Sequence, residues 1–153
     1  MFNIVLYQPE IPPNTGNIIR LCANTGAMLH LIPPLGFVLS KKTLKRAALD
    51  YLDLATIKEH KNIGECLDSI KNTRVFALST KGTTSYTKIR YKPNDTLLFG
   101  SETSGLPREV LNKDYCSEVL RVPMAEESRS INLSNTVAIV LYEGIRQLDN
   151  TLV

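Results

Sequence analysis

Two short polar segments hold residue types that could bind a nucleotide-like ligand. They are residues 100–107 (GSETSGLP) and 129–134 (RSINLS). Each follows an apolar, β-branched run, at 96–99 and at 118–123, and each leads into a helical pattern. Junctions from strand through loop to helix expose backbone amides, which suit phosphate and nucleotide groups. The sequence therefore predicts a pocket built mainly from backbone groups.

Two common phosphate sites do not fit these segments. Gly100 and Gly105 have the glycine spacing of a P-loop, but Leu106 and Pro107 stand where Lys and Ser/Thr are required. No candidate strand is followed by G-x-G-x-x-G, which argues against a conventional dinucleotide site as well. A purely structural interpretation stays open, in which Pro107 begins a helix with an acidic residue in its first turn.

The composition is that of one ordinary globular domain. The chain has 153 residues, of which 43% are hydrophobic and 22% charged, and we expect a single domain over 1–153. No run approaches the roughly 20 apolar residues of a membrane span, so no membrane partner is expected. The chain opens directly on a strand-like run at 2–7, which favours a cytoplasmic protein without a signal peptide.

Cysteine and histidine are too scattered to predict a metal site. Cys22, Cys66 and Cys116 are odd in number and widely separated, which argues against a disulfide framework and against zinc. His30 and His60 have neither a cysteine nor an acidic cluster beside them in the sequence. We interpret both as surface or satisfied histidines and expect no metal and no Cys–His catalysis.

A basic cluster stands out within a net charge of only +3. Ser40 could cap a short helix over 40–50, in which Lys41 and Lys45 form a like-charge pair at i,i+4 and Arg46 adds to the cluster. Like charges at this spacing destabilise a helix unless an anion faces them. Two interpretations remain, a solvated helix face and a nucleic-acid contact.

The elements that must position these residues alternate along the chain. Strand-like runs fall at 2–7, 28–32, 74–79, 96–99 and 118–122, with a weaker one near 54–58; helical patterns fall at 15–25, 40–50, 62–71, 107–113 and 132–148. This alternation predicts an α/β fold, a mostly parallel sheet covered by helices on both faces. Residues 81–95 are the longest polar interruption and a candidate mobile loop.

The last predicted helix is apolar over more than one face. Its main stripe, which we expect to pack on the sheet, consists of Val137, Leu141, Ile145 and Leu148. Ile139, Val140 and Tyr142 lie outside that stripe and widen the apolar surface. We favour self-association through this surface over a deeper position in the core.

A third segment completes a family resemblance. The motifs are N-x-G-N-x-x-R at 14–20, F-G-x-E-x-x-G-L-P at 99–107, and R-V-P-M with S-R-S-I-N-L-S-N at 121–135. Together they resemble the SPOUT class of S-adenosylmethionine-dependent RNA methyltransferases, in its TrmH-like 2′-O-methylating branch, along almost the whole chain. The closest resemblance is to the small single-domain tRNA enzymes of the TrmL type.

The resemblance implies a fold detail, a partner and an activity. Members carry a C-terminal trefoil knot, bind S-adenosylmethionine (AdoMet) in the knot loops and work as homodimers that complete the site. The TrmL type methylates the ribose 2′-hydroxyl of the wobble cytidine or uridine in the anticodon loop of leucine tRNAs. Two alternatives stay open: a 2′-O-methyltransferase of another tRNA position or of rRNA, and a non-catalytic AdoMet-binding RNA module.

Methyl transfer to a ribose hydroxyl is an in-line displacement that needs alignment rather than a metal. Positioning of the reactants supplies roughly 7–11 kcal/mol in favourable cases. By the resemblance, the cofactor contacts are Leu78, Gly100, Val122 and Ser130. Met124 and Leu133 could supply apolar walls beside them. Backbone groups, one hydroxyl and apolar walls from this set suit a nucleoside with a sulfonium group. For Leu78 and Val122 plain core packing is the alternative.

The resemblance also assigns residues to the substrate side. Arg20 matches the family's catalytic arginine, although a guanidinium is a poor base because its pKa exceeds about 12. We therefore prefer a clamp on the adjoining phosphate and the developing oxyanion; a surface arginine is the alternative. The residues expected to fix loops or the substrate ribose are Asn14, Asn17, Glu102, Ser134 and Asn135. Asn14 is also the expected N-cap of the first helix, and Glu102 could instead be a charge partner of a helix N-terminus.

Overall fold

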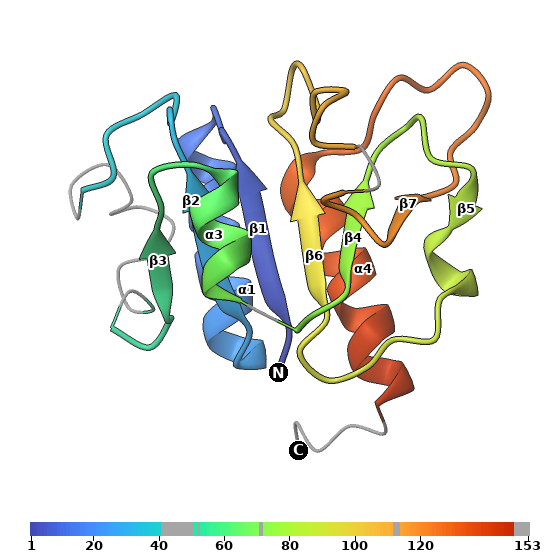
Figure 1. The fold of residues 1–153 in the computed structure, drawn as a ribbon. Coiled ribbons are helices and arrows are strands. Elements are labelled where there is room, and N and C mark those ends of the chain that lie inside the picture. The colour runs from blue at the N-terminus through green and yellow to red at the C-terminus, as the bar shows by residue number, and fades with distance from the viewer. Residues whose placement is uncertain (41–50, 52, 71, 112–113, 149–153) are drawn as a thin grey trace.

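A parallel sheet of seven strands forms the centre of the computed structural model, which describes residues 1–40, 51, 53–70, 72–111 and 114–148 (Figure 1). The strands are β1 (Asn3–Tyr7), β2 (Met28–Ile32), β3 (Ile57–Glu59), β4 (Val75–Leu78), β5 (Thr84–Ser85), β6 (Thr96–Phe99) and β7 (Glu118–Arg121). Their order is β3-β2-β1-β6-β4-β7-β5, and all six pairings are parallel. The carboxyl ends of the strands therefore meet at one edge of the sheet.

Helices cover both faces of the sheet, as predicted. Helices α1 (Pro12–Thr25) and α4 (Leu133–Gln147) lie together behind it in Figure 1, and α3 (Ile63–Ser69) lies in front. A short 3-10 turn, η1 (Tyr86–Lys88), follows β5. No helix within the described residues has the length and apolar content needed to cross a membrane.

Alternation along the central strands fills two separate cores. Ile4 and Leu6 of β1 join the cluster under α1 and α4, whereas Val5 joins the cluster under α3. In the same way Leu97 and Phe99 of β6 face one side and Leu98 the other. Strands buried on both faces read as continuous apolar runs, which is why the sequence pattern marked them clearly.

Two predicted helix positions are wrong. Helix α1 begins at Pro12 rather than near residue 15, because Pro12 and Pro13 have the backbone angle that suits the first helical turn. Over 107–111 the chain makes a turn instead of a helix, with the amides of Val110 and Leu111 bonded to the Pro107 carbonyl. There the Cys116 thiol donates to the Val110 carbonyl and pulls the segment into the α3-side core.

The polar stretch at 81–95 is ordered by contacts with α4. It contains β5, which pairs with β7, and the turn η1. The Gln147 side chain accepts from the Tyr91 amide at 3.0 Å and donates to the Ile89 carbonyl at 3.0 Å. The Tyr91 hydroxyl in turn donates to the Tyr86 carbonyl at 2.9 Å. The candidate mobile loop is thus held at several points along its length.

Helix α4 confirms most of the predicted apolar pattern, but the predicted position of one residue, Val140, is wrong. Val137, Leu141 and Ile145 are buried. Val140 is also fully buried in the core, so it does not belong to the extra apolar surface. Ile139 and Tyr142 do, with exposed fractions of 38% and 49%.

Candidate functional site

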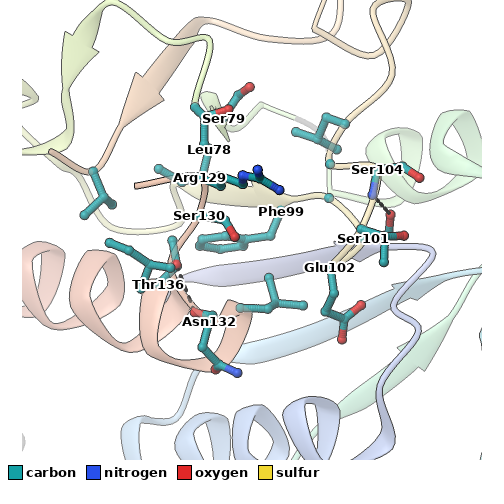
Figure 2. A pocket seen from close by; sticks show the side chains of 18 of the residues that line it. Leu78, Ser79, Phe99, Ser101, Glu102, Ser104, Arg129, Ser130, Asn132 and Thr136 are labelled. Carbon is teal, nitrogen blue, oxygen red and sulfur yellow. Dashed lines mark hydrogen bonds between the residues drawn. The ribbon is translucent and has the colours of Figure 1, made fainter. Parts of the chain in front are cut away.

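A cavity of about 580 Å³ lies at the carboxyl ends of β4, β6 and β7 (Figure 2). Ligands bind at this edge in open parallel α/β sheets, and the volume lies in the range of small-molecule sites. The walls come from residues 78–81, 99–106, 122, 124, 129–133 and 136, with Ile11 and Asn14 from the start of α1. All three motif segments of the sequence contribute to it.

The predicted cofactor residues all line this cavity. They are Leu78, Gly100, Val122, Met124, Ser130 and Leu133. Asn14 and Glu102, expected to fix loops or substrate, line it as well. The fold thus brings together residues that the sequence placed in three separate segments.

The loop after β6 is folded tightly on itself and requires glycine. Ser101 and Gly105 form an isolated bridge, with the Gly105 amide donating to the Ser101 carbonyl at 3.0 Å. Gly105 has φ +66°, a left-handed conformation that glycine adopts without cost. A Cβ atom on Gly100 would clash with the backbone of Gly105 and Leu106. The cavity wall at this point is therefore bare backbone.

Glu102 joins this loop to the start of α1. Its carboxylate accepts from the amide of Glu10 at 2.7 Å, the amide of Ile11 at 3.1 Å and the side-chain amide of Asn14 at 3.0 Å. Ile11 is the N-cap residue of α1 and offers no capping side chain, and the first turn has no acidic residue. Glu102 supplies that missing acceptor and negative charge from elsewhere in the chain, so its interpretation as a helix N-terminal partner is supported.

Asn14 and Asn132 extend the connection to the third segment. Asn14 is buried inside α1 rather than at its N-cap, and its side-chain oxygen accepts from the side-chain amide of Asn132 at 3.0 Å. Asn132 is itself the N-cap of α4 and accepts from Ser134 and Asn135. One chain of hydrogen bonds from Glu102 through Asn14 to Asn132 therefore fixes the three motif segments relative to one another.

Sequence reasoning missed several polar residues of the cavity. Ser79 and Lys81 follow directly after β4, and Arg129 and Asn132 belong to the third segment. Figure 2 places the Arg129 side chain among those around the cavity. An asparagine just before an apolar helical pattern is an N-cap signal, which would have identified Asn132. Lys81 has no such local signal, because only the strand end brings it there.

Four of the predicted residues do not line the cavity of their own chain. Ser134 and Asn135 lie in the first turn of α4, on the Asn132 cap. Asn17 and Arg20 are exposed, on the outer face of α1, while Asn14 on the same helix faces the cavity. The Arg20 guanidinium lies over the Tyr51 ring, 5.0 Å from its centroid. The basic cluster of Lys41, Lys45 and Arg46 lies outside the described residues.

The cysteines are not poised for chemistry. Burial raises the thiol pKa to about 12 for Cys22, about 12 for Cys66 and about 11 for Cys116. A thiol with such a pKa is protonated at neutral pH and is a weak nucleophile. The expectation that no cysteine acts as a nucleophile is consistent with these environments.

The histidines are buried and satisfied by each other. His30 Nδ1 and His60 Nε2 are 2.9 Å apart, and the rings stack with centroids 5.1 Å apart. The ligand atoms of Cys66 and both histidines lie within 4.8 Å of one another, so Cys66 is close in space to His30 although far from it in sequence. Of the two positions expected for these histidines, the satisfied one is confirmed and the surface one is wrong, because both side chains are buried and bonded to each other.

Known proteins resemble this chain over nearly its full length. The tRNA (cytidine(34)-2′-O)-methyltransferase of Yersinia pestis is 55% identical over 153 residues, covering 97% of this chain and 94% of the relative. A solved structure described as "Structural insights into the 2-OH methylation of C/U34 on tRNA" has a TM-score of 0.91 at 45% identity, covering 97% of each chain. An AdoMet-bound rRNA methyltransferase from Sinorhizobium meliloti has a TM-score of 0.84 at 28% identity, covering 96% of this chain and 56% of that one.

A family model gives the same assignment from sequence alone. The model of the SpoU rRNA Methylase family matches residues 1–142, which include every motif and every cavity-lining residue described above. The resemblance found in the motifs is thereby confirmed. The chain belongs to the SpoU rRNA methylase family of RNA methyltransferases.

Proposed function

We propose that the protein transfers the methyl group of AdoMet to the ribose 2′-hydroxyl of the wobble nucleotide, cytidine or uridine 34, of leucine tRNAs in the cytoplasm. Residues 1–153 act as one methyltransferase domain. The observation that carries this proposal is the cavity at which the three motif segments meet through Glu102, Asn14 and Asn132. Relatives about 50% identical over nearly their full length are named tRNA (cytidine(34)-2′-O)-methyltransferases.

The cavity fits AdoMet in size and in chemical character. Its volume of about 580 Å³ is ample for one nucleoside cofactor. The strand ends at Leu78, Gly100 and Val122 offer backbone donors and acceptors, and the missing Cβ at Gly100 lets a ligand approach the backbone. Met124 and Leu133 provide an apolar surround. The AdoMet-bound relative from Sinorhizobium meliloti supports the same cofactor.

The protein's own residues supply binding and alignment. When bound, AdoMet provides a methyl group activated by a sulfonium. The hydrogen-bonded frame of Glu102, Asn14 and Asn132 holds the cavity loops in place. These loops would orient the cofactor so that its methyl group is aligned with the attacking oxygen. Arg20 binds the adjoining phosphate and stabilises the oxyanion that forms as the hydroxyl proton passes to solvent water. This chemistry requires no metal, so calorimetry in excess EDTA should give an unchanged AdoMet affinity.

We assign the reactive unit to a homodimer. Arg20 and Asn17 lie on the exposed face of α1, outside the cavity of their own chain. On the neighbouring helix α4, Ile139 and Tyr142 are exposed apolar side chains. Pairing of two copies through these helices would cover the apolar side chains and allow the second copy to complete the substrate side of the site.

Lys41, Lys45 and Arg46 are the proposed phosphate contacts of the tRNA. Their combined replacement by Ala should raise the KM for tRNA and leave AdoMet affinity unchanged. It should also flatten the salt dependence, because fewer counterions are released on binding. Equal salt slopes for variant and wild type would remove this cluster from the RNA contact.

Mapping the modified nucleotide tests the function. Purified protein with labelled AdoMet should methylate a leucine tRNA transcript at the 2′-hydroxyl of nucleotide 34, and tRNA from a strain lacking the protein should have lost that mark. A strain that keeps every wobble 2′-O-methyl mark and loses an rRNA mark would overturn the target. A protein that binds AdoMet and RNA without transferring label would identify the non-catalytic module.

Arg20 is tested by two substitutions. Arg20→Ala should abolish methyl transfer and leave AdoMet affinity nearly unchanged, since Arg20 does not line the cavity of its own chain. Arg20→Lys should fail as well, because an ammonium lacks the planar fork that spans a phosphate and a hydroxyl oxygen. Near-normal turnover of the Lys variant would show that only the positive charge at position 20 is needed, and not the planar guanidinium.

A further inference from the structure

Arg20 is held by a ring face and by nothing else in the described part of the chain. Its guanidinium carbon lies 5.0 Å from the centroid of the Tyr51 ring. Arg20 is exposed on α1, and its side chain makes no hydrogen bond or ion pair with any of the described residues. Two other arginines of the chain, Arg74 and Arg146, form ion pairs with Asp95 and Glu143 respectively.

Tyr51 is fixed where it meets Arg20. Its carbonyl accepts from the amides of Leu54 at 3.1 Å and Ala55 at 2.9 Å, which makes a tight turn just before β3. Ala55 packs against the main core, and the following residue, Thr56, accepts from the Leu29 amide at 2.9 Å. The backbone of the half-buried Tyr51 is therefore bonded to the turn that leads into the edge strand β3.

A ring face suits an arginine that must bind something else. A carboxylate partner would occupy the N–H donors and neutralise the charge. A ring attracts the cation through its quadrupole and leaves the donors at the edge of the guanidinium free. The contact also restricts a long side chain that otherwise samples many rotamers, so less entropy is lost when the substrate binds.

We infer that Tyr51 is a positioning residue for Arg20: its ring holds the guanidinium in the orientation that receives the substrate phosphate and the reacting 2′-oxygen. The inference rests on the proposed function, because it deepens the role given to Arg20. Tyr51 acts through its ring face and its hydroxyl takes no part. Tyr51→Phe removes only the hydroxyl, whereas Tyr51→Leu removes the aromatic ring, so the two variants separate these contributions.

The first test follows the contact itself. In protein with 15N-labelled arginine, the Arg20 Nε–Hε resonance should show a ring-current shift in wild type and in Tyr51→Phe. In Tyr51→Leu the shift should disappear. Thermal unfolding of both variants is measured alongside, so that a folding defect is recognised. An Arg20 resonance that is the same in all three proteins would overturn the inference without any reference to activity.

The second test follows turnover. Tyr51→Phe should keep kcat within about twofold of wild type, and Tyr51→Leu should lower kcat roughly three- to tenfold with AdoMet affinity unchanged. A Leu variant with full kcat, while Arg20→Ala is inactive, would sink the role of Tyr51 and leave the proposed function standing. Full activity of Arg20→Ala would instead sink the proposed role of Arg20.

Discussion

The Glu102 carboxylate performs for α1 a task that no residue of α1 performs. Three donors at the start of that helix converge on it, from Glu10, Ile11 and Asn14. The bonds span 88 to 92 positions of the sequence. A single side chain thus caps a helix and closes one wall of the cavity, which couples the stability of the fold to the shape of the site.

Replacing Glu102 should therefore lower stability and AdoMet affinity together. Glu102→Ala leaves three donors without their acceptor and should reduce the free energy of unfolding by roughly 1–3 kcal/mol. Glu102→Gln retains one acceptor oxygen and should fall between wild type and Ala. Urea unfolding and calorimetry measure the two effects. The matched control is Glu127→Ala, an exposed glutamate whose carboxylate makes no hydrogen bond within the described chain. Equal losses in both Ala variants would contradict the capping role.

The cavity wall leaves no room for a side chain at Gly100. Gly100→Ala should abolish AdoMet binding in calorimetry, because the added methyl would displace the backbone of Gly105 and Leu106. Gly64→Ala, at the start of α3 and remote from the cavity, serves as the control. Wild-type affinity in the Gly100→Ala variant would show that the loop can open without loss of the site.

At the scale of elements, a buried imidazole pair joins β2 to the segment that leads into α3. His30 Nδ1 meets His60 Nε2 at 2.9 Å, and His30 Nε2 lies 3.4 Å from Asn3 Oδ1 on β1. Glu65 of α3 lies 3.9 Å from the other nitrogen of His60. A neutral His30 satisfies both contacts when its Nε2–H donates to Asn3 Oδ1 and its Nδ1 accepts from His60.

This pair should make stability fall with acid. Burial, with the charges of His60 and Lys58, lowers the His30 pKa from 6.5 to about 4. Burial also lowers the His60 pKa, partly opposed by Glu65. Above pH 6.5 His30 is neutral in the folded and in the unfolded chain, so its full contribution to stability is present. Between pH 6.5 and 4 the unfolded chain takes up the proton first, so stability is lost, by on the order of 3 kcal/mol for His30.

Urea unfolding at several pH values between 7.5 and 4.5 measures this loss. His30→Phe should start from a lower stability at pH 7.5, because it loses the bond to His60, and should show a shallower decline. The difference between the two slopes is the informative quantity, since it cancels the carboxylates common to both proteins. Parallel slopes would contradict the assignment to His30.

Local patterns predicted the strands well and the helix ends poorly. The bounds of β2 and β6 match the predicted 28–32 and 96–99, because strands buried on both faces are marked by their own apolar residues. Asn14 looks like an N-cap, but its amide and oxygen serve Glu102 and Asn132, which are 88 and 118 positions away. The two-residue strand β5 has too little sequence to carry any pattern. The cavity residues followed from motifs, whereas the position of Arg20 outside the cavity depends on the packing of α1.

At the scale of the whole molecule, α1 and α4 present the side that we assign to a second copy. Val140 points into the core, and only Ile139 and Tyr142 extend the apolar surface of the described part of α4 outward. The trefoil knot implied by the family resemblance stays a prediction. An obligate dimer typically buries about 2,000 Å² or more, so the contact should include residues around these two.

Tyr142→Asp should therefore shift the protein from dimer to monomer, because a charge would be buried in an apolar contact. Light scattering at micromolar concentration measures the change, and far-UV circular dichroism should show a folded protomer. Val140→Asp is the contrasting variant, which should unfold the protomer, since Val140 is fully buried within it. Wild-type protein that is monomeric and fully active at this concentration would overturn the dimer.

The strand order also determines how late in synthesis the central sheet can form. β1 pairs with β2 on one side, but its other neighbour is β6, which begins at Thr96. At a synthesis rate of about 5–20 residues per second, the inner edge of β1 waits several seconds or more for that partner. The wall of the cavity waits longer, for Asn132 and α4. The nascent N-terminal half thus leaves the ribosome with an open, apolar strand edge, and that half is the part of this chain for which a chaperone would have the most use.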